Sequence, residues 1–169
     1  RRVMIPNGAP RFENILEFLP PGSEWALVGA RYMGTQINSK LGWEDIERIR
    51  GRWPHKLVLK GVLCVEDAQR SEEVGADGIV LSNHGGRQLD SCVSGVELLP
   101  AVAAEVGNRI TVLVDGGFRR GSDVLKAIAH GAHGVMIGRP VLYGLAAAGE
   151  AGVAHALGML RAEMERVMM

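Results

Sequence analysis

Four short runs of mainly apolar residues recur along the chain, and each has the length of a β-strand. They cover residues 57–61, 78–83, 110–115 and 134–138. The apolar residues follow one another instead of alternating with polar ones, which is typical of parallel strands covered on both faces. The sequence therefore predicts four buried parallel strands.

Amphipathic stretches precede, separate and follow these runs, with apolar residues at steps of three and four. The expected helices cover residues 43–50, 64–74, 94–106 and 121–131, with a last helix within 150–169. Their apolar stripes are interpreted as core surface. One such stripe, in the last helix, consists of Val153, Leu157, Leu160, Met164 and Met168.

Strands that alternate with helices are typical of an α/β fold with a parallel sheet. A complete (β/α)8 TIM barrel needs eight such units and typically about 250 residues, whereas this chain has 169. In such barrels a phosphate is commonly bound by the loops after strands seven and eight, and glycine-rich turns with basic residues follow the last two strands here, so we predict that residues 42–169 form the C-terminal half of a barrel, with four βα units. Open sheet edges are unfavourable, so we expect a longer natural chain that carries four more units before Arg1.

Residues 1–41 do not follow this rhythm. Prolines are frequent there, at positions 6, 10, 20 and 21, and with the scattered glycines they interrupt any long helix. Two apolar clusters, within 15–19 and 25–28, stand out between them. We expect this stretch to be a segment of its own.

Composition narrows the class of protein. Nineteen basic residues balance nineteen acidic ones, and no basic run is interleaved with aromatics, which argues against a nucleic-acid partner. Cys64 and Cys92 lack metal or redox spacing and fit reduced thiols of a cytoplasmic protein. We find no signal-peptide pattern and no apolar run of spanning length.

Four histidines lack the spacing of metal ligands, and we assign them to surface or capping positions. They are His55, His130, His133 and His155.

A histidine and an arginine follow the second strand in the stretch SNHGGRQLD, residues 82–90. The imidazole of His84 can move a proton near neutral pH. Arg87 can bind a carboxylate through two parallel hydrogen bonds. The pair suits a small acid that must lose a proton, although a polar surface loop would also explain it.

Glycine-rich turns with basic residues follow the last two strands, at 115–121 and 138–140. Such turns let backbone N–H groups approach an anion, and arginine adds further donors, so the two together predict a phosphate cradle. Lys60 ends the first strand. It is either a cation that faces an electron-rich group of a cofactor or a lysine that reaches out to solvent.

Four motifs, in this order, resemble successive signatures of the FMN-dependent 2-hydroxy-acid dehydrogenases and oxidases. They are Leu59-Lys60-Gly61, Ser82 to Asp90, Asp115-Gly-Gly-Phe-Arg119 and Gly138-Arg139. That family includes glycolate oxidase, L-lactate dehydrogenase and mandelate dehydrogenase. The resemblance extends from about Gly42 to the C-terminus, and the element at 82–90 is its most specific part.

The resemblance implies a role for each matching residue. Lys60 would lie beside the pyrimidine edge of the flavin and stabilise the negative charge of reduced FMN, and Ser82 would contact the flavin. His84 would be the active-site base, and Arg87 would bind the substrate carboxylate. The ribityl chain and phosphate of FMN would be held by Asp115, Gly116, Gly117, Phe118, Arg119, Gly138 and Arg139.

The implied reaction is oxidation of an L-2-hydroxy acid of the lactate, mandelate or glycolate type to the 2-keto acid, with FMN as cofactor. Oxygen, a quinone or a cytochrome would take up the electrons, and we expect a homo-oligomer. Residues 1–41 would be an active-site lid or, second, a partly disordered segment in peripheral contact with the inner face of the membrane. Two alternatives stay open: another FMN- or phosphate-binding barrel, such as an isomerase or nucleotide dehydrogenase, and a non-catalytic barrel fragment.

Overall fold

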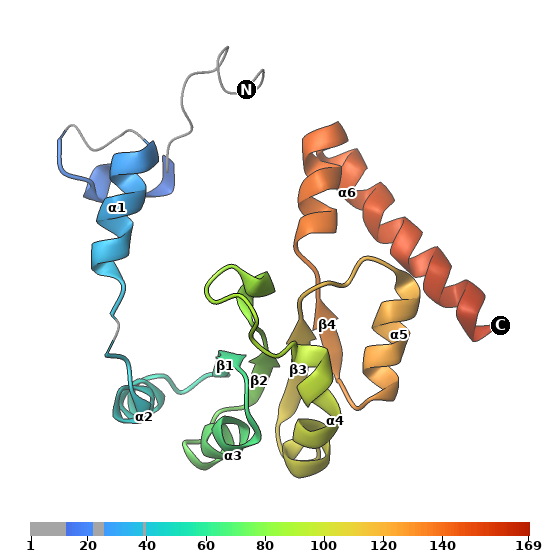
Figure 1. Ribbon diagram of the computed structural model, residues 1–169, viewed down its shortest axis with the longest axis horizontal. Coiled ribbons are helices and arrows are strands. Elements are labelled where there is room, and N and C mark those ends of the chain that lie inside the picture. The colour runs from blue at the N-terminus through green and yellow to red at the C-terminus, as the bar shows by residue number, and fades with distance from the viewer. Residues whose placement is uncertain (1–12, 22–25, 39) are drawn as a thin grey trace. The chain divides into compact units, whose positions relative to one another are not determined.

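The computed structural model describes residues 13–21, 26–38 and 40–169. The chain forms two compact units, Arg1–Gly42 and Trp43–Met169. The second unit contains a parallel sheet whose strands lie side by side in chain order (Figure 1). The strands are β1 (Val58–Val62), β2 (Gly78–Leu81), β3 (Thr111–Asp115) and β4 (Gly134–Met136).

Helices connect the strands: each of β1, β2 and β3 is followed by a helix and then by its neighbour in the sheet, and β4 is followed by α6. Next to the sheet lie α3 and α4, which contact β1–β3, and α5, which contacts β4. The helices of this unit are α2 (Trp43–Arg52), α3 (Val65–Glu73), α4 (Gly95–Val106), α5 (Gly121–Ala129) and α6 (Arg139–Met168).

All four predicted strands are present, with boundaries that differ by at most two residues. The second prediction, 78–83, was too long, because β2 ends at Leu81 and Ser82 begins the loop. The last helix, predicted within 150–169, corresponds to the part of α6 that follows non-helical backbone at Ala148 and Gly149, whereas the part of α6 from Arg139 up to this break was given no range in the prediction. Pro140 stands at the first turn of α6, where its missing N–H costs no hydrogen bond, so the turn-like sequence Gly-Arg-Pro in fact starts a helix.

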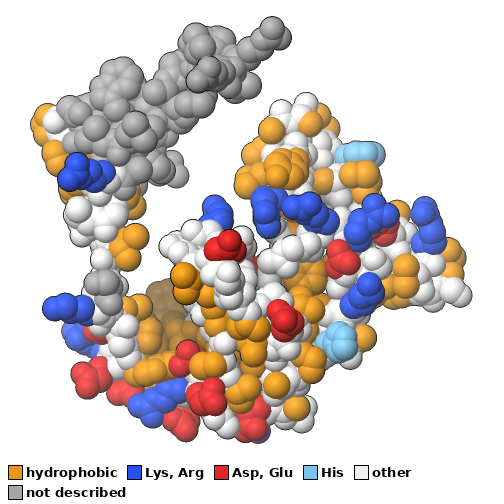
Figure 2. Space-filling view, viewed as in Figure 1, with side chains coloured by type: hydrophobic (Ala, Val, Ile, Leu, Met, Phe, Trp, Pro, Cys, Tyr) orange, Lys and Arg blue, Asp and Glu red, His pale blue; other side chains and the backbone are white. Residues whose placement is uncertain are grey.

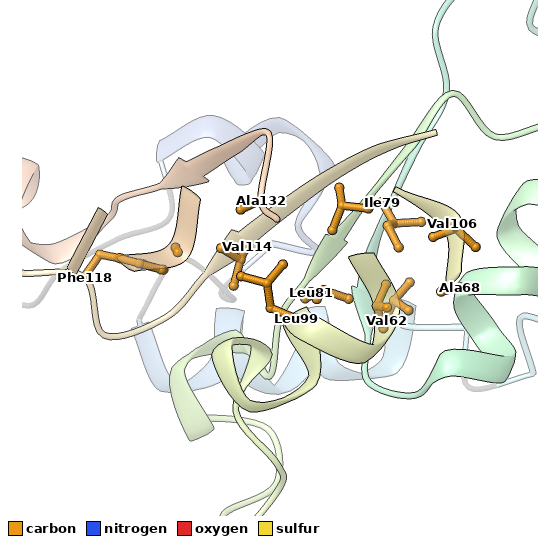
Figure 3. Packing of buried hydrophobic residues seen from close by; sticks show 12 residues of the cluster. Val62, Ala68, Ile79, Leu81, Leu99, Val106, Val114, Phe118 and Ala132 are labelled. Carbon is orange, nitrogen blue, oxygen red and sulfur yellow. The ribbon is translucent and has the colours of Figure 1, made fainter. Parts of the chain in front are cut away.

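The core lies between the sheet and the helices that cover it (Figure 3). In β3 the burial alternates, and Val112 and Val114 are fully buried. From α4, Leu99, Val102 and Val106 are fully buried at the predicted steps of three and four. The interpretation of this stripe as core surface is therefore confirmed.

The first unit contains a 3-10 helix, η1 (Glu13–Phe18), and an α-helix, α1 (Ala26–Gln36). A helix of 11 residues was not expected in this segment, and α1 fits because it lies after the prolines at 20 and 21. Part of the predicted apolar cluster at 25–28, namely Trp25, lies outside the described residues, as do the prolines at 6 and 10. Within the described ranges, no helix is long and apolar enough to cross a membrane.

Asp77 ties the amino ends of β1 and β2 to α2. Its carboxylate accepts hydrogen bonds from Lys56 Nζ at 2.7 Å, from the Leu57 N–H at 2.9 Å and from Arg50 Nη1 at 3.1 Å. These partners, Lys56 first and the Leu57 N–H second, lower the pKa of Asp77 from 3.8 to about 2. The ionised carboxylate therefore stabilises the end of the sheet opposite to the loops that follow the strands.

We expect Asp77→Asn to lower the melting temperature at neutral pH by a few degrees. Because the pKa is lower in the folded than in the unfolded chain, this stabilisation is complete above about pH 4 and is lost as the pH falls towards about 2. The gap in melting temperature between the wild type and the variant should close over that range in thermal unfolding scans. Glu73→Gln, which breaks an exposed ion pair with Arg70, is the control. A gap that does not change with pH would contradict this role.

Candidate active site

A cleft of about 320 Å³ lies at the carboxyl ends of the strands. The carboxyl ends of parallel strands meet at one edge of a sheet, and this is the catalytic edge of α/β barrels. Basic side chains gather along this edge (Figure 2). Ten of the eleven predicted site residues line the cleft: Lys60, His84, Arg87, Asp115, Gly116, Gly117, Phe118, Arg119, Gly138 and Arg139.

The eleventh, Ser82, lies beneath the cleft and links two of its residues. Ser82 is fully buried, and its Oγ accepts a hydrogen bond from Lys60 Nζ at 2.6 Å and another from the His84 N–H at 3.1 Å. Lys60 also forms an ion pair with Asp115 across the sheet. Lys60 is thus held at the site by two oxygens, while its side chain is still 37% exposed.

Asn83 shapes the turn that carries the histidine. Its Oδ1 accepts hydrogen bonds from the Gly85 and Gly86 N–H groups, at 3.0 and 3.2 Å, and its Nδ2 donates to the Val93 carbonyl at 3.3 Å. These bonds fix the 3-10 turn η2 (His84–Gly86). No role was predicted for Asn83, although an asparagine before glycines is typical of such side-chain-to-backbone turns.

His84 adopts a left-handed backbone conformation, with φ of 55°. This region is uncommon for residues other than glycine and costs about 1 kcal/mol. The ring lies over β1 at Gly61, where an added Cβ would come within 3.4 Å of His84 Cε1. The turn therefore presents an exposed imidazole at the cleft at some cost in backbone energy.

Arg87 is anchored to the same turn. Its Nε donates to the His84 carbonyl at 3.2 Å. Among the described residues, its two terminal nitrogens have no hydrogen-bond partner. An anchored guanidinium with free terminal donors can bind a carboxylate ligand.

The loop after β3 approaches the cleft through two glycines with left-handed backbone, Gly116 with φ of 95° and Gly117 with φ of 82°. Phe118, only 5% exposed, anchors the loop in the core. Asp115 Oδ1 is buried and has no hydrogen-bond partner within the described part of the chain. An unpaired buried carboxylate oxygen is costly, so it fits a ligand that donates a hydroxyl hydrogen bond at this point.

The turn after β4 reaches the same cleft from the other side. Gly138 precedes the first turn of α6 and makes no side-chain capping bond. Arg139 lies over the histidine turn, since a Cβ added at Gly85 would come within 3.6 Å of Arg139 Nη2. Both predicted anion turns therefore lie around one cleft, with three arginines, Arg87, Arg119 and Arg139, lining it.

The other histidines lie away from the cleft. His133 holds β4 to β3, because its N–H donates to the Val112 carbonyl at 2.8 Å and its Nδ1 accepts from the Val112 N–H at 3.1 Å. The ring of His55 meets that of Trp53 edge to face. His133 is therefore part of the sheet scaffold, a role that the sequence analysis did not assign.

Residues 6–169 match the sequence profile of a family described as FMN-dependent dehydrogenase. The chain is 44% identical over 164 residues to (S)-mandelate dehydrogenase of Pseudomonas putida, a match that covers 97% of this chain and 40% of that protein. It is 49% identical over 137 residues to an L-lactate oxidase of a Nostoc species, which covers 81% of this chain and 38% of that protein.

The chain is also similar to solved structures of such proteins. The structure of the monotopic membrane protein (S)-mandelate dehydrogenase superposes with a TM-score of 0.84 at 44% identity and covers 97% of this chain. A mandelate oxidase with benzoyl-formic acid superposes with a TM-score of 0.73 at 52% identity and covers 76%. The chain spans about two fifths of these relatives, 43% and 38%. The predicted fold class, four βα units of a TIM barrel, is confirmed.

Proposed function

Because the chain belongs to the FMN-dependent dehydrogenase family, we propose that its protein oxidises an L-2-hydroxy acid of the lactate, mandelate or glycolate type to the 2-keto acid. The observation that carries this proposal is the cleft itself, where His84 and Arg87 lie with Lys60 and two anion turns. This reaction requires a base, a group that binds the carboxylate and a cofactor site on one edge of the sheet, and these residues would supply all three.

FMN fits the residues of the cleft. The unpaired, buried Oδ1 of Asp115 would accept a hydrogen bond from a ribityl hydroxyl. Arg119 and Arg139, together with the left-handed glycines 116 and 117, would bind the phosphate. Lys60, held by Ser82 and Asp115, would place its positive charge beside the flavin ring. When bound, FMN would supply the acceptor for two electrons.

The substrate would bind between Arg87 and His84. Arg87 would hold the carboxylate with its free terminal nitrogens, which turns the neighbouring carbon and its hydroxyl towards the imidazole. His84 would then take up a proton from the substrate as general base. Ser82 contacts both Lys60 Nζ and the His84 N–H, so it would link the cation beside the flavin to the backbone that carries the base.

The two alternatives predict different behaviour in one experiment. A non-catalytic barrel fragment would purify without flavin absorbance or fluorescence. Another FMN-binding barrel would be yellow, but L-2-hydroxy acids would not bleach it. We expect a yellow protein whose flavin loses its visible absorbance when L-lactate, (S)-mandelate or glycolate is added without oxygen. A flavin that none of these acids bleaches would contradict the proposed function.

We further propose that residues 1–41, which lie in the first unit Arg1–Gly42, contact a membrane surface, as the second of the two roles expected for this segment. In support, the relative whose match covers 97% of this chain is described as a monotopic membrane protein. The first unit also exposes large apolar side chains, among them Phe18 and Ile37. Co-sedimentation of the protein with anionic vesicles tests this, and binding that survives deletion of residues 1–42 would contradict it.

The lid role, the cytoplasmic location on the inner face of the membrane and the homo-oligomer stay part of the proposal. So does the electron acceptor, which can be oxygen, a quinone or a cytochrome. Turnover of the substrate-reduced flavin in air, measured against turnover with a soluble quinone, distinguishes an oxidase from a dehydrogenase.

Arg139→Ala is expected to weaken FMN retention. The substitution removes a charge-assisted contact with the phosphate, worth roughly 1.5–3 kcal/mol, which raises the dissociation constant about 10- to 100-fold. The measurement is the flavin content after extensive dialysis, with the dissociation constant from flavin fluorescence. Arg161→Ala, which breaks an exposed ion pair with Glu165 on α6, is the matched control. Unchanged flavin content in Arg139→Ala would exclude a phosphate contact.

A further inference from the structure

The end of the loop after β3 is pressed against the second half of α6. Gly121, the first residue of α5, is buried there, and an added Cβ would come within 2.4 Å of the Leu160 carbonyl oxygen and 2.6 Å of the Met164 N. No side chain fits between these two backbones. The position of α6 therefore determines where the loop Asp115–Arg120 ends.

Glu163 makes the polar contacts at this point. Its Oε2 accepts a hydrogen bond from the Gly121 N–H at 2.7 Å, across 42 positions of sequence, and its Oε1 forms an ion pair with Arg120 Nε at 3.3 Å. Its side chain is only 29% exposed, whereas that of Arg120 is 71% exposed. A partly buried carboxylate with two charge-assisted partners holds a loop end more firmly than an exposed ion pair does.

The two helices that begin at the cleft differ in how their first N–H groups are used. At α5, Asp123 Oδ2 accepts from the Arg120 N–H at 3.1 Å and the Arg119 N–H at 3.4 Å, and Glu163 accepts from Gly121. At α6, Gly138 makes no side-chain capping bond. Two carboxylates thus occupy the start of α5, and a further anion there would meet their negative charge. A phosphate is therefore favoured on the side of Gly117, Gly138 and Arg139.

We propose that Glu163 is a positioning residue for the cofactor phosphate. By fixing Gly121 and Arg120, it sets the distance between the loop Asp115–Arg119 and the turn at Gly138–Arg139, so that one phosphate contacts both. This inference rests on the proposed function, because it takes the anion to be the phosphate of FMN. Glu163 lies on the side of the loop that faces α6, and it is not among the residues that line the cleft.

Riboflavin makes the test specific, since it has the ring and the ribityl chain of FMN but no phosphate. The dissociation constants of FMN and riboflavin are measured by flavin fluorescence for the full wild-type chain, Glu163→Ala, Glu163→Gln and Glu165→Ala. Glu165 is the control because it lies on the same helix and, among the residues that the structure describes, pairs only with Arg161 of that helix. Melting temperatures are recorded for all four.

The wild type should prefer FMN over riboflavin. Glu163→Ala should lower that preference roughly tenfold, which is the expected effect if the displaced loop loses one charge-assisted hydrogen bond to the phosphate. Glu163→Gln keeps an oxygen for the Gly121 N–H and should retain part of the preference, while Glu165→Ala should keep all of it. Equal losses for both flavins, or no loss, in Glu163→Ala would overturn the positioning role and leave the proposed function standing. A wild type that does not prefer FMN over riboflavin would overturn both.

Discussion

His84→Gln should keep its flavin and yet reduce it roughly 10²- to 10⁴-fold more slowly when a 2-hydroxy acid is added, which is the usual cost of losing a general base. Glutamine retains a polar side chain of similar reach but cannot accept and carry a proton at neutral pH. The turn should survive, because its hydrogen bonds come from Ser82, from Asn83 and from the backbone of residue 84.

Anaerobic stopped-flow reduction of the bound flavin measures this rate without interference from the electron acceptor. His155→Gln is the matched control, since His155 is exposed in α6 and lies outside the cleft. Reduction of His84→Gln at nearly the wild-type rate would end the assignment of His84 as the base. Loss of flavin from this variant would instead mean that the turn supports the cofactor.

Arg87→Lys should lower kcat/KM for the 2-hydroxy acid roughly 10- to 100-fold although it keeps the positive charge. In the wild type, Nε is bound to the His84 carbonyl while the two terminal nitrogens stay free for a carboxylate. A lysine has one nitrogen and cannot anchor itself to the turn and also bind a carboxylate in bidentate fashion. Both KM and kcat should suffer, because the carboxylate also orients the reacting carbon.

Steady-state kinetics with L-lactate and (S)-mandelate measure the effect, and the melting temperature is recorded alongside. Arg161→Lys, an exposed arginine on α6, serves as the control for a general effect of the exchange. If Arg87→Lys loses thermal stability but keeps both kinetic constants, the role of Arg87 is to hold the turn and not the substrate.

The sheet and most of the cleft could be predicted from the sequence because the signals are local. Each strand is a continuous apolar run, and each site motif follows a strand directly, so that Lys60, His84, Asp115 and Arg139 had to meet at the same edge. Once the strands are taken as parallel neighbours in chain order, these residues are expected at one edge of the sheet, even though 79 positions separate Lys60 from Arg139.

The residues that support the loop after β3 and the far end of the sheet could not be predicted in this way. Glu163 and Asp77 act through contacts with residues 42 and 20 positions away, and their own neighbours in sequence carry no sign of these partners. No range was assigned to the first part of α6, which begins at Arg139 with Pro140 in its first turn and ends at the non-helical residues Ala148 and Gly149.

Because residue 84 has a left-handed backbone, stability favours a glycine at this position, whereas the proposed catalysis requires a histidine. Glycine, which occupies the next two positions of the turn, adopts that conformation without cost. Variants selected for thermal stability alone should therefore tend to lose the histidine at position 84. Only selection on turnover would keep an imidazole there. Attempts to make this protein more heat-stable should therefore hold position 84 constant and seek their gains at the opposite end of the sheet, around Asp77.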